Sequence, residues 1–495
     1  MPLIRWEDEI VRAVRGRHPL IYLQSPEEER VIEGLRALAP KCFAGGTLST
    51  WSCISGLEPA EKEDTSDPVT ALRHLIAHPR PGFCLMRDLS AFLEDPKVTR
   101  GLREAYFTLR RDYKSALVVL SPLASYQGSL AKQFYYVEPA PPPQEELSAK
   151  VAAVEKLYPP DRLPPELRPH ALMALSGLTL DETEHVMHRV LGGGAPRESI
   201  LQEIFSAKQT IARQAGFLEF VPSVLDTSAV GGLDNARRWV EERRGFFSHA
   251  AVAAGLPIPR GVLIMGISGC GKSLLAKSIA GLWQVPLFRL NMSLIFSGLY
   301  GTPEGAFHTA LRTIEAVAPA VLWIDEMEAS LSSPKEPGSP QAMTFSTFLT
   351  WLQEKPPLVF VAATANRIEM LPPEIIRKGR FDEVFFCDLP DDQDRADIIQ
   401  ITLQRNGVDP STVDINRLIA CTDTKNGAEI EQAIIAARIE AGQQGRLPST
   451  QDIYNKAQYM VPLSQTMSEQ IKAIRNWALK RATPASSRPY MGAAR

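Results

Sequence analysis

The sequence predicts an α/β protein whose second half forms a parallel β-sheet covered by helices on both faces. After Arg260, short apolar segments alternate with helical segments, which is the pattern of such a sheet. A fainter alternation of the same kind runs up to residue 143. At 495 residues the chain is too long for one ordinary hydrophobic core, so we expect more than one domain.

The expected elements of the second half follow in a regular order. Buried strands are predicted for the apolar segments G-V-L-I-M-G, V-P-L-F-R-L-N, A-V-L-W-I-D, L-V-F-V-A-A-T and E-V-F-F-C-D-L. Helices are predicted between them over 272–282, 303–317 and 342–354. Helical patterns are also predicted on either side of this series.

A Pro-rich stretch at 139–145 and a Gly-rich stretch at 192–196 interrupt the chain. The predicted parts are an N-terminal α/β domain (1–143), a helical lid-like subdomain (144–196), a linker helix (197–224), a large α/β subdomain (225–389), a helical lid (390–445), and a C-terminal helix with a basic tail (446–495).

Composition narrows the class of protein. The net charge of −3 provides no general attraction to nucleic acid or to an anionic membrane. The six cysteines are scattered without a C-x-x-C pair, which is typical of a reducing compartment. Acidic residues stand where a signal peptide needs an apolar run, and no uncharged apolar stretch is long enough to span a membrane. We therefore expect a cytoplasmic protein.

A glycine-rich loop after the first of these strands matches the P-loop pattern, from Gly266 to Ser273. Its backbone N–H groups would surround phosphate oxygens, Lys272 would reach the terminal phosphates, and the Ser273 hydroxyl would hold Mg²⁺. Cys270 fits as a small loop residue, with a redox-sensitive thiol as the alternative. The candidate phosphate-binding residues are Gly266, Ser268, Gly269, Cys270, Gly271, Lys272, Ser273 and Leu274.

Polar residues follow the next two central strands. Asp325 and Glu326 end the segment A-V-L-W-I-D-E, where Asp325 would complete the Mg²⁺ shell and Glu326 would orient and polarise the attacking water. Asn366 ends V-F-V-A-A-T-A-N and would lie beside that water and the γ-phosphate, unless it only makes a local turn. Together these residues predict ATP hydrolysis with Mg²⁺.

Arg377 and Arg380 stand just before the last strand of the series. If the nucleotide lies at the opposite strand ends, these arginines could reach only a neighbouring subunit's site. An arginine supplied in trans neutralises charge on the γ-phosphate and makes hydrolysis depend on assembly. The alternative is that both form surface ion pairs.

These motifs together resemble the AAA ATPases within the AAA+ class. V-G-G-L-D at 230–234, the P-loop, I-D-E-M-E, T-A-N-R and R-K-G-R-F-D occur in the order of that family, and Gly427-Ala428-Glu429 matches its lid motif. The whole chain is similar to the AAA proteins first noted as a conserved chloroplast reading frame, with cyanobacterial and other bacterial relatives. The resemblance implies Gly232, Gly427 and Ala428 at the nucleotide, Arg377 and Arg380 as arginine fingers, and a homohexameric ring.

One position departs from the ring translocases of that family. They carry an aromatic residue in the first pore loop, two residues before a glycine. Here Leu299 holds that place and Tyr300 is beside it, just before Gly301. A protein substrate contacted through Leu299 and Tyr300 is therefore one interpretation, and simple packing of both side chains is the other.

The first half resembles an altered copy of the same plan. P-L-I-Y-L-Q-S is a plausible first strand, but P-E-E-E follows it in place of Gly-Lys, and acids repel phosphate. Gly82–Asp88 resembles the strand that ends in Asp325, with Leu89 in the place of the catalytic acid Glu326. Leu130–Phe134 stands where the segment with Arg377 and Arg380 stands in the second half, but it lacks both arginines. We expect a degenerate AAA+-like domain that does not hydrolyse ATP, with an unrelated α/β adaptor domain as the alternative.

The most favoured function is a ring ATPase that remodels or translocates a macromolecule, with a protein as the favoured substrate. A scaffold whose assembly is controlled by ATP is the second reading, and a nucleic-acid motor is disfavoured by charge. Residues 472–495 hold six basic residues and no acid, which predicts a solvated tail, with nucleic-acid or lipid contact as the weaker alternative.

Overall fold

The structure, a computed structural model, describes residues 5–487 except 60–63, 123–129, 160–161, 194–199, 222–230, 298–301, 331–339, 368–369, 373 and 378. The chain divides into two compact units. The first comprises Met1–Pro142 and Thr179–Glu182, and the second comprises Pro143–Leu178 and Thr183–Arg495.

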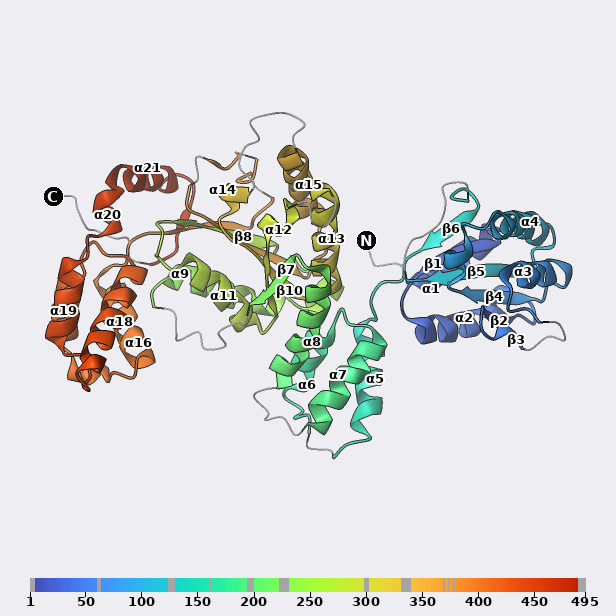
Figure 1. The fold of residues 1–495 in the computed structure, drawn as a ribbon, viewed down its shortest axis with the longest axis horizontal. Helices are drawn as coiled ribbons and strands as arrows, with labels where there is room; N and C mark the ends of the chain where they lie inside the picture. Colours follow the sequence, from blue (N-terminus) through green and yellow to red (C-terminus); the bar gives the residue numbers. More distant parts are fainter. Residues whose placement is uncertain are drawn as a thin grey trace. The chain divides into compact units, whose positions relative to one another are not determined.

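The first unit contains a six-stranded sheet in the order β3-β2-β4-β5-β1-β6 (Figure 1). All neighbouring strands run parallel except β2 and β3. Both faces of the central strands are buried, which explains their nearly continuous apolar sequences. The strands are β1 (Leu20–Gln24), β2 (Thr47–Ser52), β3 (Gly56–Glu58), β4 (Gly82–Arg87), β5 (Ser115–Ser121) and β6 (Phe134–Val137).

Helices cover both faces of this first sheet. Helices α1 (Trp6–Arg15) and α2 (Glu28–Cys42) supply one hydrophobic core, and α3 (Pro68–Ala77) and α4 (Pro96–Asp112) supply the other. Asp67 and Asp95 cap the second pair, each accepting a backbone hydrogen bond just before a proline in the first turn. The first unit is thus a three-layer α/β/α fold.

The second unit is built on a seven-stranded sheet in the order β13-β12-β8-β11-β10-β9-β7. The five strands from β12 to β9 are parallel and correspond to the five predicted segments. The strands are β7 (Leu218–Val221), β8 (Gly261–Gly266), β9 (Leu287–Leu290), β10 (Ala320–Ile324), β11 (Val359–Ala365), β12 (Glu383–Cys387) and β13 (Thr483–Pro484).

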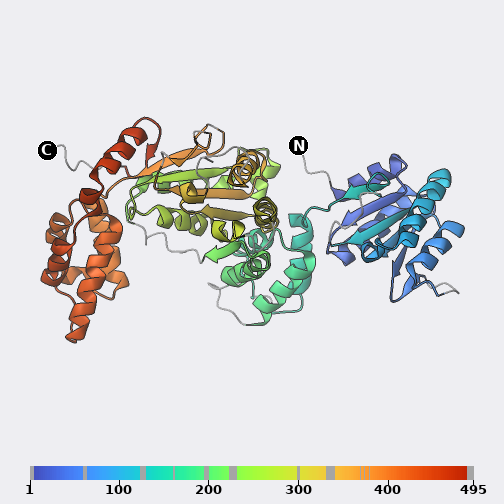
Figure 2. The same ribbon diagram turned by 45° about the horizontal axis from the view of Figure 1, so that its top comes forward.

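Two helical layers enclose the second sheet (Figure 2). One contains α9 (Asp234–Arg243) and α11 (Lys272–Trp283), and the other contains α13 (Pro303–Ala316) and α15 (Pro340–Glu354). The three helices predicted between strands are therefore confirmed. Shorter helices complete the layers, namely α10 (His249–Ala253), α12 (Met292–Ile295) and α14 (Met327–Ser330).

The two sheets repeat one strand order. Reading from the equivalent edge, the first unit has β6-β1-β5-β4-β2 and the second has β12-β8-β11-β10-β9, so chain positions 5-1-4-3-2 match in both. In each, the first strand leads directly into a helix, α2 or α11. This repetition agrees with the expectation of an altered copy of the same plan in the first half.

Helical subdomains flank the second sheet. Before it come α5 (Gln144–Glu155), α6 (Arg168–Leu175), α7 (Leu180–Gly192) and α8 (Ile200–Ala215). After it come α16 (Asp392–Arg405), α17 (Ile415–Cys421), α18 (Gly427–Gln443) and α19 (Thr450–Tyr459). Ile453 of α19 is buried in the core of this second group. The helical lid therefore continues beyond residue 445, the end expected from the sequence.

Both edge strands of the second sheet differ from the sequence expectation. The predicted linker helix over 197–224 is α8 followed by β7, which pairs antiparallel with β9. The predicted solvated tail is instead packed through residue 487: α20 (Leu463–Thr466) and α21 (Ser468–Ala478) precede β13, which pairs with β12. A two-residue strand containing a proline leaves no alternating pattern to detect, and an edge position tolerates that proline.

Candidate active site

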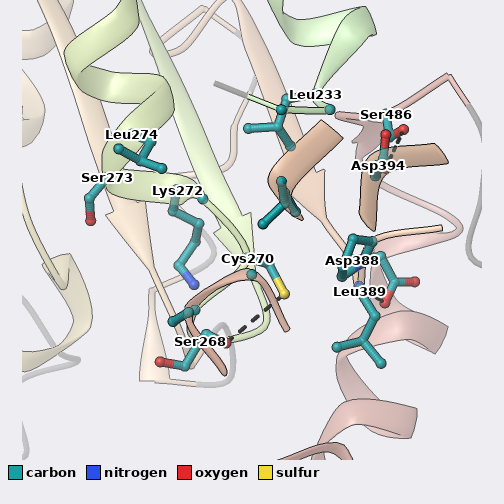
Figure 3. Close-up of a pocket in the computed structure, with 18 of the residues that line it drawn as sticks. Leu233, Ser268, Cys270, Lys272, Ser273, Leu274, Asp388, Leu389, Asp394 and Ser486 are labelled. Carbon is teal, nitrogen blue, oxygen red and sulfur yellow. Dashed lines mark hydrogen bonds between the residues drawn. The ribbon is translucent and has the colours of Figure 1, made fainter. Parts of the chain in front are cut away.

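A cavity of about 700 Å³ lies at the carboxyl ends of the central strands of the second sheet. The P-loop, the ends of β10 and β11, the lid helices α16 and α18, and the C-terminal helix α21 all contribute to its wall (Figure 3). Most of the sequence-predicted site residues line it: Gly232, Ser268, Gly269, Cys270, Gly271, Lys272, Ser273, Leu274, Asp325, Glu326, Asn366, Gly427 and Ala428.

Gly266 starts the P-loop in a conformation reserved for glycine. Its φ is 146°, and a Cβ there would lie 2.0 Å from the Cys387 carbonyl oxygen of β12. The next residue, Ile267, donates its N–H to the same carbonyl at 3.1 Å. Gly266 therefore lets the loop turn tightly against β12, and it supports the cavity without lining it.

Lys272 opens helix α11 with its side chain directed under the loop. Its Nζ donates to the carbonyl oxygens of Gly266 at 3.0 Å and Ile267 at 2.8 Å. Burial lowers the pKa of this amino group. The group lies beside the N-terminus of a helix, an arrangement suited to bind phosphate.

Cys270 is buried in the loop, with its Sγ 4.0 Å from the Ser268 carbonyl oxygen. Burial raises the pKa of this thiol far above its ordinary value. A thiol that stays protonated is a poor nucleophile and a poor redox sensor. The geometry therefore favours the interpretation of Cys270 as a small packing residue of the loop.

The acids after β10 are connected through Thr364 of β11. The Thr364 hydroxyl donates to Asp325 Oδ1 at 2.6 Å and accepts the backbone N–H of Glu326 at 3.0 Å. Thr364 lines the cavity as well. In the sequence this threonine is part of T-A-N-R, which gave it no role of its own. The available signal was its place near the end of the strand that follows the acids in the chain.

Asn366 contacts two glutamates. Its side-chain Nδ2 donates to Glu326 Oε1 at 3.0 Å, and its backbone N–H donates to Glu328 Oε1 at 2.8 Å. Glu328 is buried and also accepts the N–H of Arg367 at 3.2 Å. Glu328 thereby anchors the chain just after β11, a role that its place in I-D-E-M-E did not reveal by itself.

The residues present fit a nucleotide with Mg²⁺. The Ser273 hydroxyl and the Asp325 carboxylate supply the oxygen ligands that Mg²⁺ prefers. Among the described residues, no group of three or more His, Cys, Asp or Glu side chains is arranged to hold a metal by itself. A magnesium ion that takes its remaining ligands from phosphate and water needs only such a partial set.

The lid helix α18 contacts the P-loop directly. Ala428 donates its N–H to the Gly269 carbonyl oxygen at 3.1 Å. Asn426 and Glu429 form a capping box around this helix start. Glu429 also accepts the N–H of Leu463 at 2.7 Å. The lid motif is thus held at the loop, which brings Gly427 and Ala428 to the cavity wall.

Arg377 and Arg380 lie elsewhere. They precede β12, and Asp382 between them and the strand donates its N–H to the carbonyl of Gly261, at the amino end of β8. The P-loop begins at the other end of β8, roughly 16 Å away for five residue steps. Neither arginine lines the cavity; Arg377 is exposed, and Arg380 donates to the Glu374 carbonyl oxygen.

In the first unit, a glutamate occupies the turn that corresponds to the P-loop. Glu27 precedes α2 and is 8% exposed. Its Oε2 accepts from Arg30 Nη1 at 2.8 Å and its Oε1 accepts from the N–H of Leu180 at 2.9 Å. The carboxylate is thus bonded to an arginine of α2 and to the first backbone N–H of α7.

The charges of the second site are reversed in the first. Glu28 is the first residue of α2, as Lys272 is of α11. Arg87 ends β4, and the following Asp88 has a φ of 53°, matching Glu326 at 45° after Asp325. Arg87, not Asp88, therefore corresponds to Asp325, so the sequence alignment that put Leu89 in the place of Glu326 was wrong by one residue. Arg87 Nη1 and Glu28 Oε2 are 3.6 Å apart.

Two protein-family models match this chain, one in each half. Residues 262–389 match the model of the ATPase family associated with various cellular activities (AAA), and residues 6–139 match the N-terminal domain of SpoVK-like AAA ATPases. The ATP-dependent zinc metalloprotease FtsH of Pirellula staleyi is 34% identical over 225 residues, 43% of this chain and 32% of that protein. The fold and the site define an AAA ATPase, an enzyme that binds and hydrolyses ATP.

Longer matches define the family. The AAA domain-containing protein ycf46 of Guillardia theta is 33% identical over 479 residues, 94% of this chain and 93% of that protein. The ycf46 protein of Pyropia yezoensis is 32% identical over 476 residues, 94% of this chain and 96% of that protein. The chain belongs to the family of the ycf46 AAA domain-containing proteins. Within the described residues, no helix is both long and apolar enough to cross a membrane.

Proposed function

We propose that this ATPase works as a homo-oligomeric ring, of six subunits in the arrangement that its motifs resemble, and couples hydrolysis to the remodelling or translocation of a protein. The AAA module is similar to that of FtsH, whose name describes ATP-dependent proteolysis. That likeness supports a protein substrate. The pore-loop positions Leu299 and Tyr300 lie outside the described residues.

In this proposal the chain divides the chemistry among its own side chains. Lys272 and the loop amides bind the phosphates, and Ser273 and Asp325 would hold Mg²⁺, whose charge offsets that of the phosphate oxygens. Glu326 orients the attacking water and accepts its proton. The 3.0 Å hydrogen bond from Asn366 keeps the Glu326 carboxylate in place.

One observation supports the ring. Arg377 and Arg380 lie near the amino ends of the parallel strands, whereas Lys272 and Asp325 lie at the carboxyl ends. Within one subunit these arginines cannot reach the γ-phosphate of the bound nucleotide. A neighbour packed head-to-tail against that edge would receive them. Such a contact closes into a ring or continues as a spiral.

The decisive experiment is a dilution series of the wild-type ATPase combined with light scattering. A finger supplied in trans is typically worth about 10³–10⁵ in rate, so specific activity should rise with protein concentration and level off once assembly is complete. Arg377→Ala, added as a minority, should depress the wild-type subunits it contacts. The exposed Arg312→Ala on α13 is the matched control and should leave the mixing curve linear.

Constant activity per subunit down to concentrations at which scattering shows only monomer would refute both the fingers and the ring. The same assay discriminates between partner classes. Stimulation by an unfolded protein supports the proposed substrate class, and stimulation by DNA instead would favour a nucleic-acid motor. A nearly silent enzyme that assembles on ATP would favour the scaffold.

A further inference from the structure

The C-terminal segment, defined as residues 468–487, is joined to the AAA module at several points. Ala485 donates its N–H to the Phe386 carbonyl oxygen at 2.9 Å and accepts the N–H of Ala236 at 3.1 Å. Arg475 forms a bidentate ion pair with Asp388 just after β12, with a shortest distance of 2.7 Å. The segment is therefore a fixed part of the module.

The same segment forms a wall of the nucleotide cavity. Arg475, Leu479 and Ser486 all line it. Ser486 stands on the side away from Lys272, beside Asp394 of helix α16 (Figure 3). Because Lys272 marks the phosphate end, the wall made by the C-terminal segment belongs to the end that would hold the base.

Asp394 is the polar group at this end. It lies in the first turn of α16, is 8% exposed and lines the cavity. The Ser486 hydroxyl donates to its Oδ2 at 3.1 Å, as Figure 3 shows. A Cβ on Gly232 would be 2.9 Å from its Oδ1, so only a glycine allows the carboxylate to approach the loop so closely.

Apolar side chains also line the cavity that Asp394 faces. Leu233 and Ile398 line the same part of the cavity and suit the faces of a purine ring. An ionised carboxylate only accepts hydrogen bonds. At the 6-position of a purine it therefore favours the amino group of adenine and opposes the carbonyl oxygen of guanine.

We propose that Asp394, held by Ser486 of the C-terminal segment, accepts a hydrogen bond from the exocyclic amine of adenine and so selects adenine over guanine nucleotides. This inference rests on the proposed ATP site. It makes the C-terminal segment part of the substrate site, where the sequence suggested only a helix with a basic tail.

The ionisation of Asp394 agrees with this role at neutral pH. Burial, together with the neighbouring carboxylates of Asp391 and Asp234, raises its pKa to about 6, while the Ser486 hydroxyl opposes that change. Asp391 caps the same helix and Asp234 begins α9. At pH 7.5 the carboxylate is therefore still mostly ionised and able to accept.

The test is calorimetric binding of ADP and GDP at pH 7.5 to the full chain. Wild-type protein should prefer ADP by at least about tenfold, the usual worth of a hydrogen bond to a charged group. Asp394→Asn should reduce the ADP-to-GDP affinity ratio by about tenfold, because an amide can also donate to the guanine carbonyl. Ser486→Ala should reduce the ratio by a smaller factor, because the carboxylate loses the donor that orients it.

Ser487→Ala is the matched control. Ser487 is the next residue after Ser486, and its hydroxyl donates to Asp234 Oδ2 at 3.1 Å. Its side chain does not line the cavity. An unchanged ratio in Asp394→Asn, or equal binding of ADP and GDP by the wild type, would overturn the base subsite and leave the ATPase intact. Wild-type protein that binds neither nucleotide would overturn the proposed function with it.

Discussion

At the scale of single residues, the position of Glu326 is determined from two sides. Its φ of 45° is unusual for a residue with a side chain and costs about 1 kcal/mol. The backbone hydrogen bond to Thr364 and the side-chain hydrogen bond from Asn366 hold it in this conformation. Strain that the surroundings maintain in this way is common where a side chain must be aimed at a substrate.

Glu326→Gln should therefore keep ATP binding and lose turnover by orders of magnitude, because the amide cannot accept the proton of the attacking water. Single-turnover hydrolysis and ATP affinity, measured on the same preparation, check the two halves of this prediction. Glu354→Gln at the end of α15 serves as the control with the same change of charge. A hydrolysis rate equal to that of the wild type would refute the role of Glu326.

At the scale of elements, the first turn of α16 is packed between the loop that contains Gly232 and the C-terminal segment. This packing buries Asp394 near Asp391 and Asp234 and raises its pKa to about 6 from an ordinary value of 3.8. A raised carboxyl pKa means that the folded state binds the proton more tightly than the unfolded state does. Stability then falls as the pH rises from about 4 to 6, and the cost persists at neutral pH.

Asp394→Asn should remove this cost. Because the side chain keeps some solvent contact, we expect a gain of about 1 kcal/mol at pH 7.5, or about 2–4 °C in Tm for a domain of this size. Below about pH 3 the wild-type carboxyl is protonated in both states, so the difference should vanish. Thermal unfolding without nucleotide at pH 7.5 and at about pH 3 measures both ends. A variant less stable than the wild type at pH 7.5 would contradict the assigned cause.

At the scale of the whole molecule, one strand order occurs in both units, but the charges at its carboxyl edge do not. The second unit has Lys272 and Asp325, whereas the first has Glu28 and Arg87. Glu27, in the turn itself, accepts from Arg30 and from the Leu180 N–H. Negative carboxylates at this turn repel phosphate. We therefore propose that the first unit retains the strand order of the nucleotide-binding fold and does not bind phosphate.

Nucleotide binding should accordingly show one site per chain. Lys272→Ala should abolish ATP binding to the whole protein, since the described turn of the first unit carries Glu27 and Glu28 where the second unit has its P-loop and Lys272. Lys277→Ala, five residues further along α11 with its Nζ over the Trp323 ring, is the matched control and should bind normally. Calorimetric stoichiometry measures both variants. Tight residual binding to Lys272→Ala would show that the first unit has a site of its own.

The sequence by itself determined which segments form the five parallel strands, where the P-loop lies, and which acids follow β10. Each of these depends only on neighbouring residues and on local periodicity. The central strands and the helices between them are confirmed within a few residues. It also indicated that the first half repeats the plan, and the common strand order agrees with that prediction.

Only the tertiary structure decided which distant residues meet. Strand register and backbone φ show that Arg87 of the first unit corresponds to Asp325 of the second. The sequence had suggested Asp88 as the residue that corresponds to Asp325. Thr364, Glu328 and Asp394 entered the site through contacts made between strands and helices. Ser486 reached Asp394 across 92 positions of the chain through a two-residue edge strand with no detectable pattern. Periodicity reports which face of an element is buried, but the partner on that face is chosen by packing of the whole chain.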